Sequence, residues 1–102
     1  MHVISRRRLR EFAAGRPDSE TPLDDWYRTA SKAKWQSIND VRRVYPHADA
    51  VTVASGNDVT VFNVAGNKYR LVTAIHYDAQ RVYVLKVMTH AEYNKDKWKA
   101  TL

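Results

Sequence analysis

The stretch VTVFNVAGNKYRLVTAIHYDAQRVYVLKVMTHAEYNKDKW, residues 59 to 98, decides the fold class of this chain. It is rich in Val, Ile, Thr and Tyr, which strands favour, and turn sequences interrupt it at Gly66-Asn67 and Asp78-Ala79. With a similar run just upstream, it predicts four strands, at residues 50–54, 59–65, 68–77 and 80–88. Because their connections are short, neighbouring strands are expected to be antiparallel.

The residues before these strands predict a short first strand at residues 2–5 and three helices. The first helix begins at Ser5 and ends before Pro17, the second begins at Thr21, and the third extends from Ser37 to Pro46. Helical spacing marks their core-facing residues. These are Leu9, Phe12 and Ala13, then Leu23, Trp26, Tyr27 and Ala30, then Ile38, Val41 and Val44. Nothing in the sequence repeats.

Side chains alternate between the two faces of a strand, so the last two strands can be assigned faces. The face covered by helices is expected to hold Tyr69, Leu71, Thr73 and Ile75, with Tyr83, Leu85 and Val87. The opposite face is expected to hold Arg70, Val72, Ala74 and His76, with Val82, Val84, Lys86 and Met88. This assignment places two fixed cations, Arg70 and Lys86, on one face. A final helix at about residues 91–99 should pack Tyr93 or Trp98 on the sheet.

Composition limits the function further. The chain has 102 residues, enough for one domain, and 44% are hydrophobic, which argues against a disordered protein. The net charge of +6 attracts polyanions, nucleic acid first among them, although an inert basic surface is the alternative. The absence of cysteine excludes disulfides and thiolate chemistry. No apolar run is long enough for a membrane helix, so the cytoplasm is the expected location.

A basic surface with a titratable residue suits phosphodiester chemistry. Metal-independent RNA cleavage requires proton transfer at two oxygens and stabilisation of added negative charge on phosphorus. His90 follows the last strand, and histidine transfers protons near neutral pH. The other histidines, His2, His47 and His76, lack the spacing of a metal site, so no metal is expected. The competing interpretations are that His90 caps the final helix, that Arg70 is a solvated surface cation, and that Tyr93 is a core residue.

Four segments resemble the HigB toxins of bacterial toxin–antitoxin systems, which belong to the RelE-like superfamily. They are HVIS (2–5), YPHAD (45–49), FNVAGNKYRLV (62–72) and VMTHAEYNK (87–95), so the resemblance covers nearly the whole chain. It implies a single RelE-like α+β domain over residues 1–102. Its N-terminal helices would pack on one face of a mostly antiparallel, twisted sheet, a short helix would follow at the C-terminus, and the opposite face would form a basic groove.

The resemblance also implies an activity and partners. Relatives of this kind are endoribonucleases that cleave ribosome-bound mRNA by attack of the 2′-hydroxyl, without a cofactor. A HigA-like helix-turn-helix antitoxin would neutralise the toxin, and the pair would bind operator DNA. The rival interpretation is a non-catalytic RNA- or ribosome-binding module that has kept the fold and lost turnover. Lys86 and Asn94 support that rival, because the family often has arginine and aspartate at these positions.

Site roles follow from the same resemblance. His90 is the expected general acid or base, Arg70 the phosphate clamp, Lys86 a second cation, and Tyr93 a hydrogen-bond donor or stacking ring. The substrate groove is expected to include Lys68, Asn63, Asn94 and, as part of a basic N-terminal run, Arg6.

Overall fold

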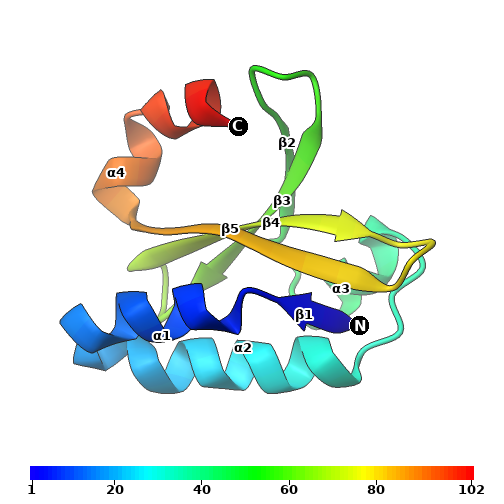
Figure 1. Cartoon of the computed structure of the whole chain (residues 1–102), viewed down its shortest axis with the longest axis horizontal. Helices are drawn as coiled ribbons and strands as arrows, with labels where there is room; N and C mark the ends of the chain where they lie inside the picture. Colours follow the sequence, from blue (N-terminus) through cyan, green and yellow to red (C-terminus); the bar gives the residue numbers. More distant parts are fainter.

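A five-stranded sheet forms the centre of the molecule (Figure 1). The computed structural model describes residues 1–102. In spatial order the strands are β1 (His2–Ile4), β5 (Arg81–Thr89), β4 (Tyr69–His76), β3 (Asp58–Val64) and β2 (Asp49–Thr52). Strands β2 to β5 pair antiparallel in chain order, whereas β1 pairs parallel with β5. All five predicted strands are confirmed, with ends displaced by one or two residues.

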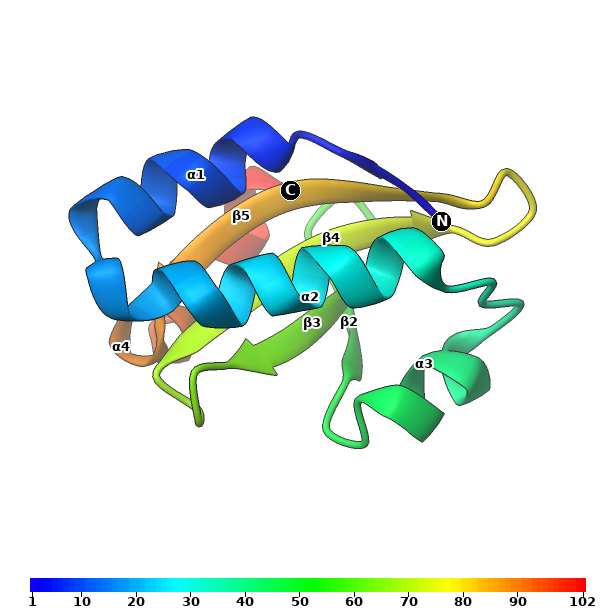
Figure 2. The ribbon, with the colours of Figure 1, turned by 90° about the horizontal axis from the view of Figure 1, so that it is seen from below.

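The N-terminal helices cover one face of this sheet. Helix α1 (Arg6–Gly15) lies beside β5, and α2 (Glu20–Lys32) crosses below β3 and β4 (Figure 2). A short 3-10 turn, η1 (Pro17–Ser19), joins them. The predicted stripe on α2 is confirmed, because Leu23, Trp26 and Ala30 are buried and the Trp26 ring meets Phe62 of β3 edge-on, with 5.3 Å between ring centroids. The sheet therefore packs on this layer of helices through a buried apolar core.

Helix α3 (Ile38–Val44) corrects one predicted core position. Val41 is fully buried, but Val44 is 51% exposed, so its assignment to the core was wrong. Val44 follows Ile38 by six residues, so at 3.6 residues per turn its side chain points about 120° away from that of Ile38 around the helix axis. Ser5 and Ser37 stand directly before α1 and α3, as their places in the sequence predict, but neither side chain forms a capping hydrogen bond.

The C-terminal segment covers the middle of the opposite face. Helix α4 (His90–Asn94) leads into η2 (Lys97–Thr101), and both lie above the sheet in Figure 1, on the side away from α1 and α2. Trp98 is 5% exposed and packs in a second apolar cluster with Val61, Val72 and Met88. The prediction that this whole face forms a basic groove was therefore wrong, because the chain folds back to bury Trp98 there.

A β-bulge in β5 corrects the predicted faces of that strand. Val72 of β4 lies opposite Lys86, but the next residue, Thr73, lies opposite Val84, so Leu85 has no partner. The extra residue reverses the alternation. Val82 and Val84 therefore pack with the helices, and Leu85 packs in the second cluster, each on the face opposite to its predicted one. Tyr83 also changes face, since its ring meets His76 with 5.2 Å between centroids. Lys86 and Met88 keep their predicted face.

The junction of η1 and β4 gives a testable pH effect on stability. The Tyr69 hydroxyl donates to Asp18 at 2.7 Å, and Lys68 lies 3.4 Å away. The hydrogen bond from Tyr69 holds the pKa of Asp18 below its ordinary 3.8, against an opposing effect of burial, and Lys68 lowers the pKa further. A lowered folded-state pKa means that ionised Asp18 stabilises the fold above pH 3.8 and that this contribution disappears as the pH falls through the lowered pKa.

We therefore expect Asp18→Asn to lower the urea midpoint of unfolding at pH 7. The difference from the wild type should shrink as the pH falls below 3.8, because the wild-type carboxylate is then protonated. Urea titrations of both proteins between neutral and acidic pH measure this difference. A difference independent of pH would contradict the role assigned to the Asp18 charge.

Candidate active site

Arg70 is a buried cation without a carboxylate partner. It lies near the start of β4, between Asn63 of β3 and Met88 of β5 in the ladder, and is 8% exposed. Its Nη1 donates to the backbone oxygens of Asn67 at 2.9 Å and Tyr69 at 3.3 Å. None of the six ion pairs in the structure includes Arg70. A buried charge of this kind is costly, and a bound anion would compensate it.

The cap of α4 and a backbone hydrogen bond to the turn before β4 hold His90 beside Arg70. Thr89 caps α4 by a reciprocal pair of hydrogen bonds with Glu92, and the backbone N–H of Thr89 lowers the pKa of Glu92. The backbone N–H of His90 donates to the Lys68 oxygen at 2.9 Å. Thr89 therefore performs the capping role, and the exposed His90 ring is left for other contacts. Its Nδ1 lies 2.8 Å from Nη2 of Arg70.

The contact with Arg70 fixes the proton of the His90 ring. A guanidinium has only donors, so Nδ1 accepts this hydrogen bond and the neutral ring carries its proton on Nε2. A doubly protonated ring would present a hydrogen to the guanidinium and lose the contact. His90 can use both nitrogens in proton transfer only when Arg70 turns to another acceptor, and a phosphate oxygen is such an acceptor.

Tyr93 joins the site and the second apolar cluster. It follows His90 by three residues, and the Arg70 Cζ lies 5.5 Å from its ring centroid. On Trp98 the ring is stacked, with 5.3 Å between centroids and 21° between planes. Burial, followed by the negative charge of Asp49, raises the pKa of Tyr93, so its phenol stays neutral and able to donate a hydrogen bond. Tyr93 is thus both a packing residue and a neighbour of the buried cation.

The remaining candidates are dispersed. Asn63 lies opposite Arg70 and donates to the Asn67 side chain at 2.9 Å, so it belongs to the site. Lys68 is exposed and pairs with Asp18. Arg6 pairs with Asp24 at 3.4 Å and lies over the Tyr27 ring, in a pocket between α1 and α2. These two cations point elsewhere, so the structure does not bring their side chains to Arg70.

Lys86 and Asn94 make no contact with the pair of Arg70 and His90. Lys86 shares the face of Arg70, but it is a diagonal neighbour across the ladder, roughly 7–8 Å away. It is half-buried and lines a groove between α1 and the C-terminal segment. Asn94 is exposed near the end of α4.

One residue of the site was not predicted from the sequence. Asn67 accepts from both Arg70 and Asn63, and it has a left-handed backbone with φ 77°. The Gly66-Asn67 sequence predicted a turn here, but it did not predict the hydrogen bonds that Asn67 accepts. The side chains do not gather three or more potential metal ligands at any place. None of the helices combines the length and hydropathy needed to cross a membrane.

Comparisons with known proteins agree with this architecture. Residues 19–96 match the HigB_toxin family, described as a RelE-like toxic component of a toxin-antitoxin system. The chain is 31% identical over 94 residues to the mRNA interferase toxin HigB of Escherichia coli (strain K12), and equally to an mRNA interferase HigB of Shigella flexneri. Those alignments cover 92% of this chain and 88% of each relative. An mRNA interferase HigB from another Escherichia coli strain is 28% identical over 95 residues, covering 93% of this chain and 90% of the relative.

Proposed function

The chain belongs to the HigB family of RelE-like toxins, and from that premise we propose that it is an endoribonuclease that cleaves messenger RNA. The observation that carries this proposal is the contact between the buried, unpaired Arg70 and His90. It combines in one place a binding group for phosphate and a group for proton transfer. The reaction is attack of the ribose 2′-hydroxyl on the adjacent phosphorus.

Arg70 acts on the phosphate. Its guanidinium donates two hydrogen bonds to non-bridging oxygens, which become more negative as the 2′-oxygen adds to phosphorus. Backbone oxygens of Asn67 and Tyr69 hold the other nitrogen, so the donors are oriented before the substrate arrives. Burial strengthens this electrostatic effect, because little water competes for the charge.

His90 performs one of the two proton transfers. When Arg70 turns its Nη2 to the phosphate, Nδ1 of His90 is released, and the ring can accept the 2′-hydroxyl proton or donate to the leaving 5′-oxygen. The bond from phosphorus to the 5′-oxygen breaks, which leaves a 2′,3′-cyclic phosphate and a 5′-hydroxyl. The neutral Tyr93 phenol is a further hydrogen-bond donor beside the same phosphate.

The partners follow from the family. As the toxic component of a toxin–antitoxin system, the protein acts with an antitoxin, and we assign it a HigA-like helix-turn-helix partner. Operator DNA would be bound only through the complex of the two proteins. The site of action is translated mRNA on the ribosome, in the cytoplasm.

Cleavage of a defined mRNA tests the proposal, with ribosomes both present and absent. We expect cleavage to stop when the nucleotide 5′ to the cut carries a 2′-O-methyl group, since the nucleophile is then blocked. Mass spectrometry of the products should find a 2′,3′-cyclic phosphate. Cutting of the methylated RNA would refute 2′-hydroxyl attack.

A further inference from the structure

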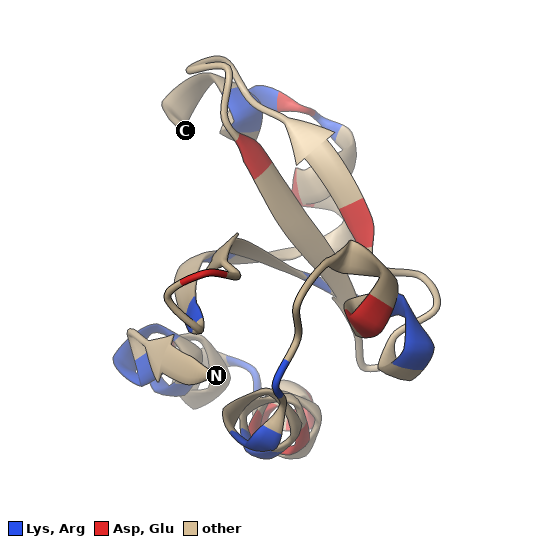
Figure 3. Ribbon diagram, turned by 90° about the vertical axis from the view of Figure 1, so that its right-hand side faces the viewer, with Lys and Arg blue, Asp and Glu red and all other residues tan.

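A basic groove lies on the α1 side of the junction between β5 and α4. Its volume is about 790 Å³, within the range of ligand sites. Three elements line it: α1, the end of β5, and the segment from α4 to η2. Figure 3 shows Lys and Arg on α1 and again in the C-terminal segment. The charged residues of this groove are Arg8, Lys86, Lys95, Lys97, Glu11 and Glu92.

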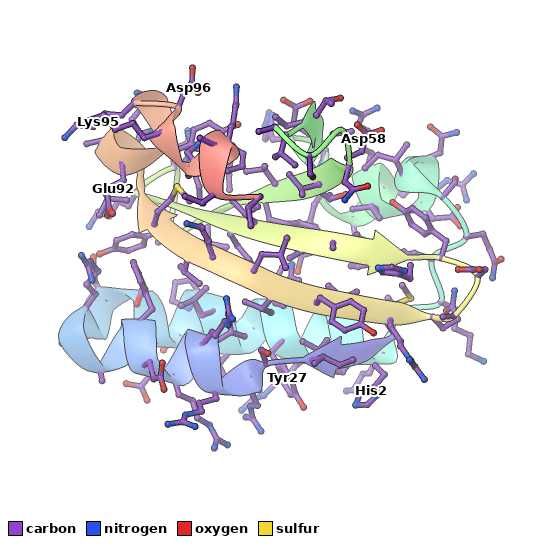
Figure 4. All side chains as sticks on the ribbon, turned by 45° about the horizontal axis from the view of Figure 1, so that its top comes forward. His2, Tyr27, Asp58, Glu92, Lys95 and Asp96 are labelled. Atoms are coloured by element: carbon purple, nitrogen blue, oxygen red, sulfur yellow. The ribbon has the colours of Figure 1, made fainter.

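The cations of the groove are unpaired, whereas both carboxylates are engaged. Arg8, Lys86, Lys95 and Lys97 take part in none of the ion pairs. Glu11 is paired with Arg7 at 2.8 Å, and Glu92 accepts two hydrogen bonds from Thr89. In Figure 4, Glu92 of α4 lies nearer to α1 than Lys95 does. With four cations and two carboxylates, the groove carries a net formal charge of +2, although the charge of Lys95 also acts on Glu92.

The groove reaches the candidate active site through one residue. Met88 lines the groove and lies directly opposite Arg70 in the ladder, and His90 follows Met88 by two residues. A chain bound at Arg70 can therefore continue past the start of α4 into the groove. Arg8 donates to the backbone oxygen of Leu85, which fixes the distance between α1 and the edge of β5.

We propose that this groove binds the phosphate backbone of the RNA strand that flanks the cleavage point. The inference rests on the proposed function for the identity of the ligand. Spaced, unpaired lysines match a repeating polyanion and read no base edges, so binding should be independent of sequence. Apolar residues, among them Phe12 and Met88, line the groove between the charged side chains. In this account Lys86 is a backbone-binding residue and does not act on the scissile phosphate.

Binding of a non-cleavable RNA tests the groove separately from catalysis. The probe is a short single-stranded 2′-O-methyl oligonucleotide of mixed sequence, bound by the full chain over a range of salt concentrations. The variant is Lys95→Gln/Lys97→Gln, both of whose positions are exposed. Lys32→Gln/Lys34→Gln is the matched control, because it removes the same charge from exposed positions at the far end of α2.

Each lost phosphate contact should reduce the slope of log affinity against log salt by about 0.7. We expect the slope of the groove variant to be smaller than that of the wild type by about 1.4. Raising the salt from about 50 to 200 mM should therefore weaken RNA binding by the variant roughly sevenfold less than it weakens binding by the wild type. The control should keep the wild-type slope. An unchanged slope in the groove variant, or an equal reduction in the control, would overturn the proposal.

Two further outcomes separate the hypotheses. If the groove variant keeps its RNA affinity but binds the antitoxin more weakly, the groove is a protein-binding surface and the proposal is wrong. If the wild-type protein cleaves no RNA yet the groove variant shows the expected reduction in slope, the groove proposal stands and the nuclease assignment fails.

Discussion

Replacing Arg70 by Lys should slow RNA cleavage by about 10²–10³-fold, the usual cost of removing an oriented donor from a developing oxyanion. Lysine keeps the positive charge but replaces the planar fork by a single ammonium, so it cannot hold the Asn67 oxygen and two phosphate oxygens together. The measurement is the single-turnover rate constant on a mapped mRNA.

Two controls accompany Arg70→Lys. Arg81→Lys makes the same change at an exposed strand position and should cleave at the wild-type rate. Thermal unfolding of Arg70→Lys shows whether the buried position tolerates lysine. A folded Arg70→Lys protein with normal cleavage would remove Arg70 from the mechanism.

Replacing His90 by Gln should lower the cleavage rate by about 10²–10⁴-fold, the usual contribution of general acid–base catalysis. Glutamine can still accept the hydrogen bond from Arg70, but it transfers no protons. Because His90 is exposed, the fold should be unaffected. The rate should be measured against pH, since the variant should also lose the part of the profile that depends on the histidine.

His47 supplies the control for the His90 variant. It is exposed in the turn after α3, and His47→Gln should behave as the wild type in both rate and pH profile. Wild-type cleavage by His90→Gln would instead support the rival interpretation of a binding module whose apparent activity has another source.

The strands and most of the helical core could be predicted because they depend on local pattern. Leu23, Trp26 and Ala30 follow helical spacing, and the strands are rich in β-branched residues bounded by turn sequences. The bulge at Leu85 could not be predicted, because it arises from pairing between β4 and β5 and no single residue encodes it. It alone reversed the faces of Val82 and Val84.

The pairing of Arg70 and His90 was predicted only in part. The sequence placed both at the same end of the last two strands, but their contact depends on the turn at Asn67 and on the bond from His90 to Lys68. The burial of Arg70 was not predicted either, because it requires α4 and Tyr93 to fold over the sheet. Tertiary contacts of this kind leave no local pattern.

Arg70 and His90 act as one catalytic unit only if their effects on the cleavage rate are coupled, and a double-mutant cycle measures that coupling. The single-turnover rates of the wild type, Arg70→Lys, His90→Gln and the double variant should be measured on the same RNA. Residues that act in one step are strongly non-additive, so the double variant should be about as slow as the slower single variant. Costs that multiply in the double variant, or single variants with normal rates, would contradict the claim.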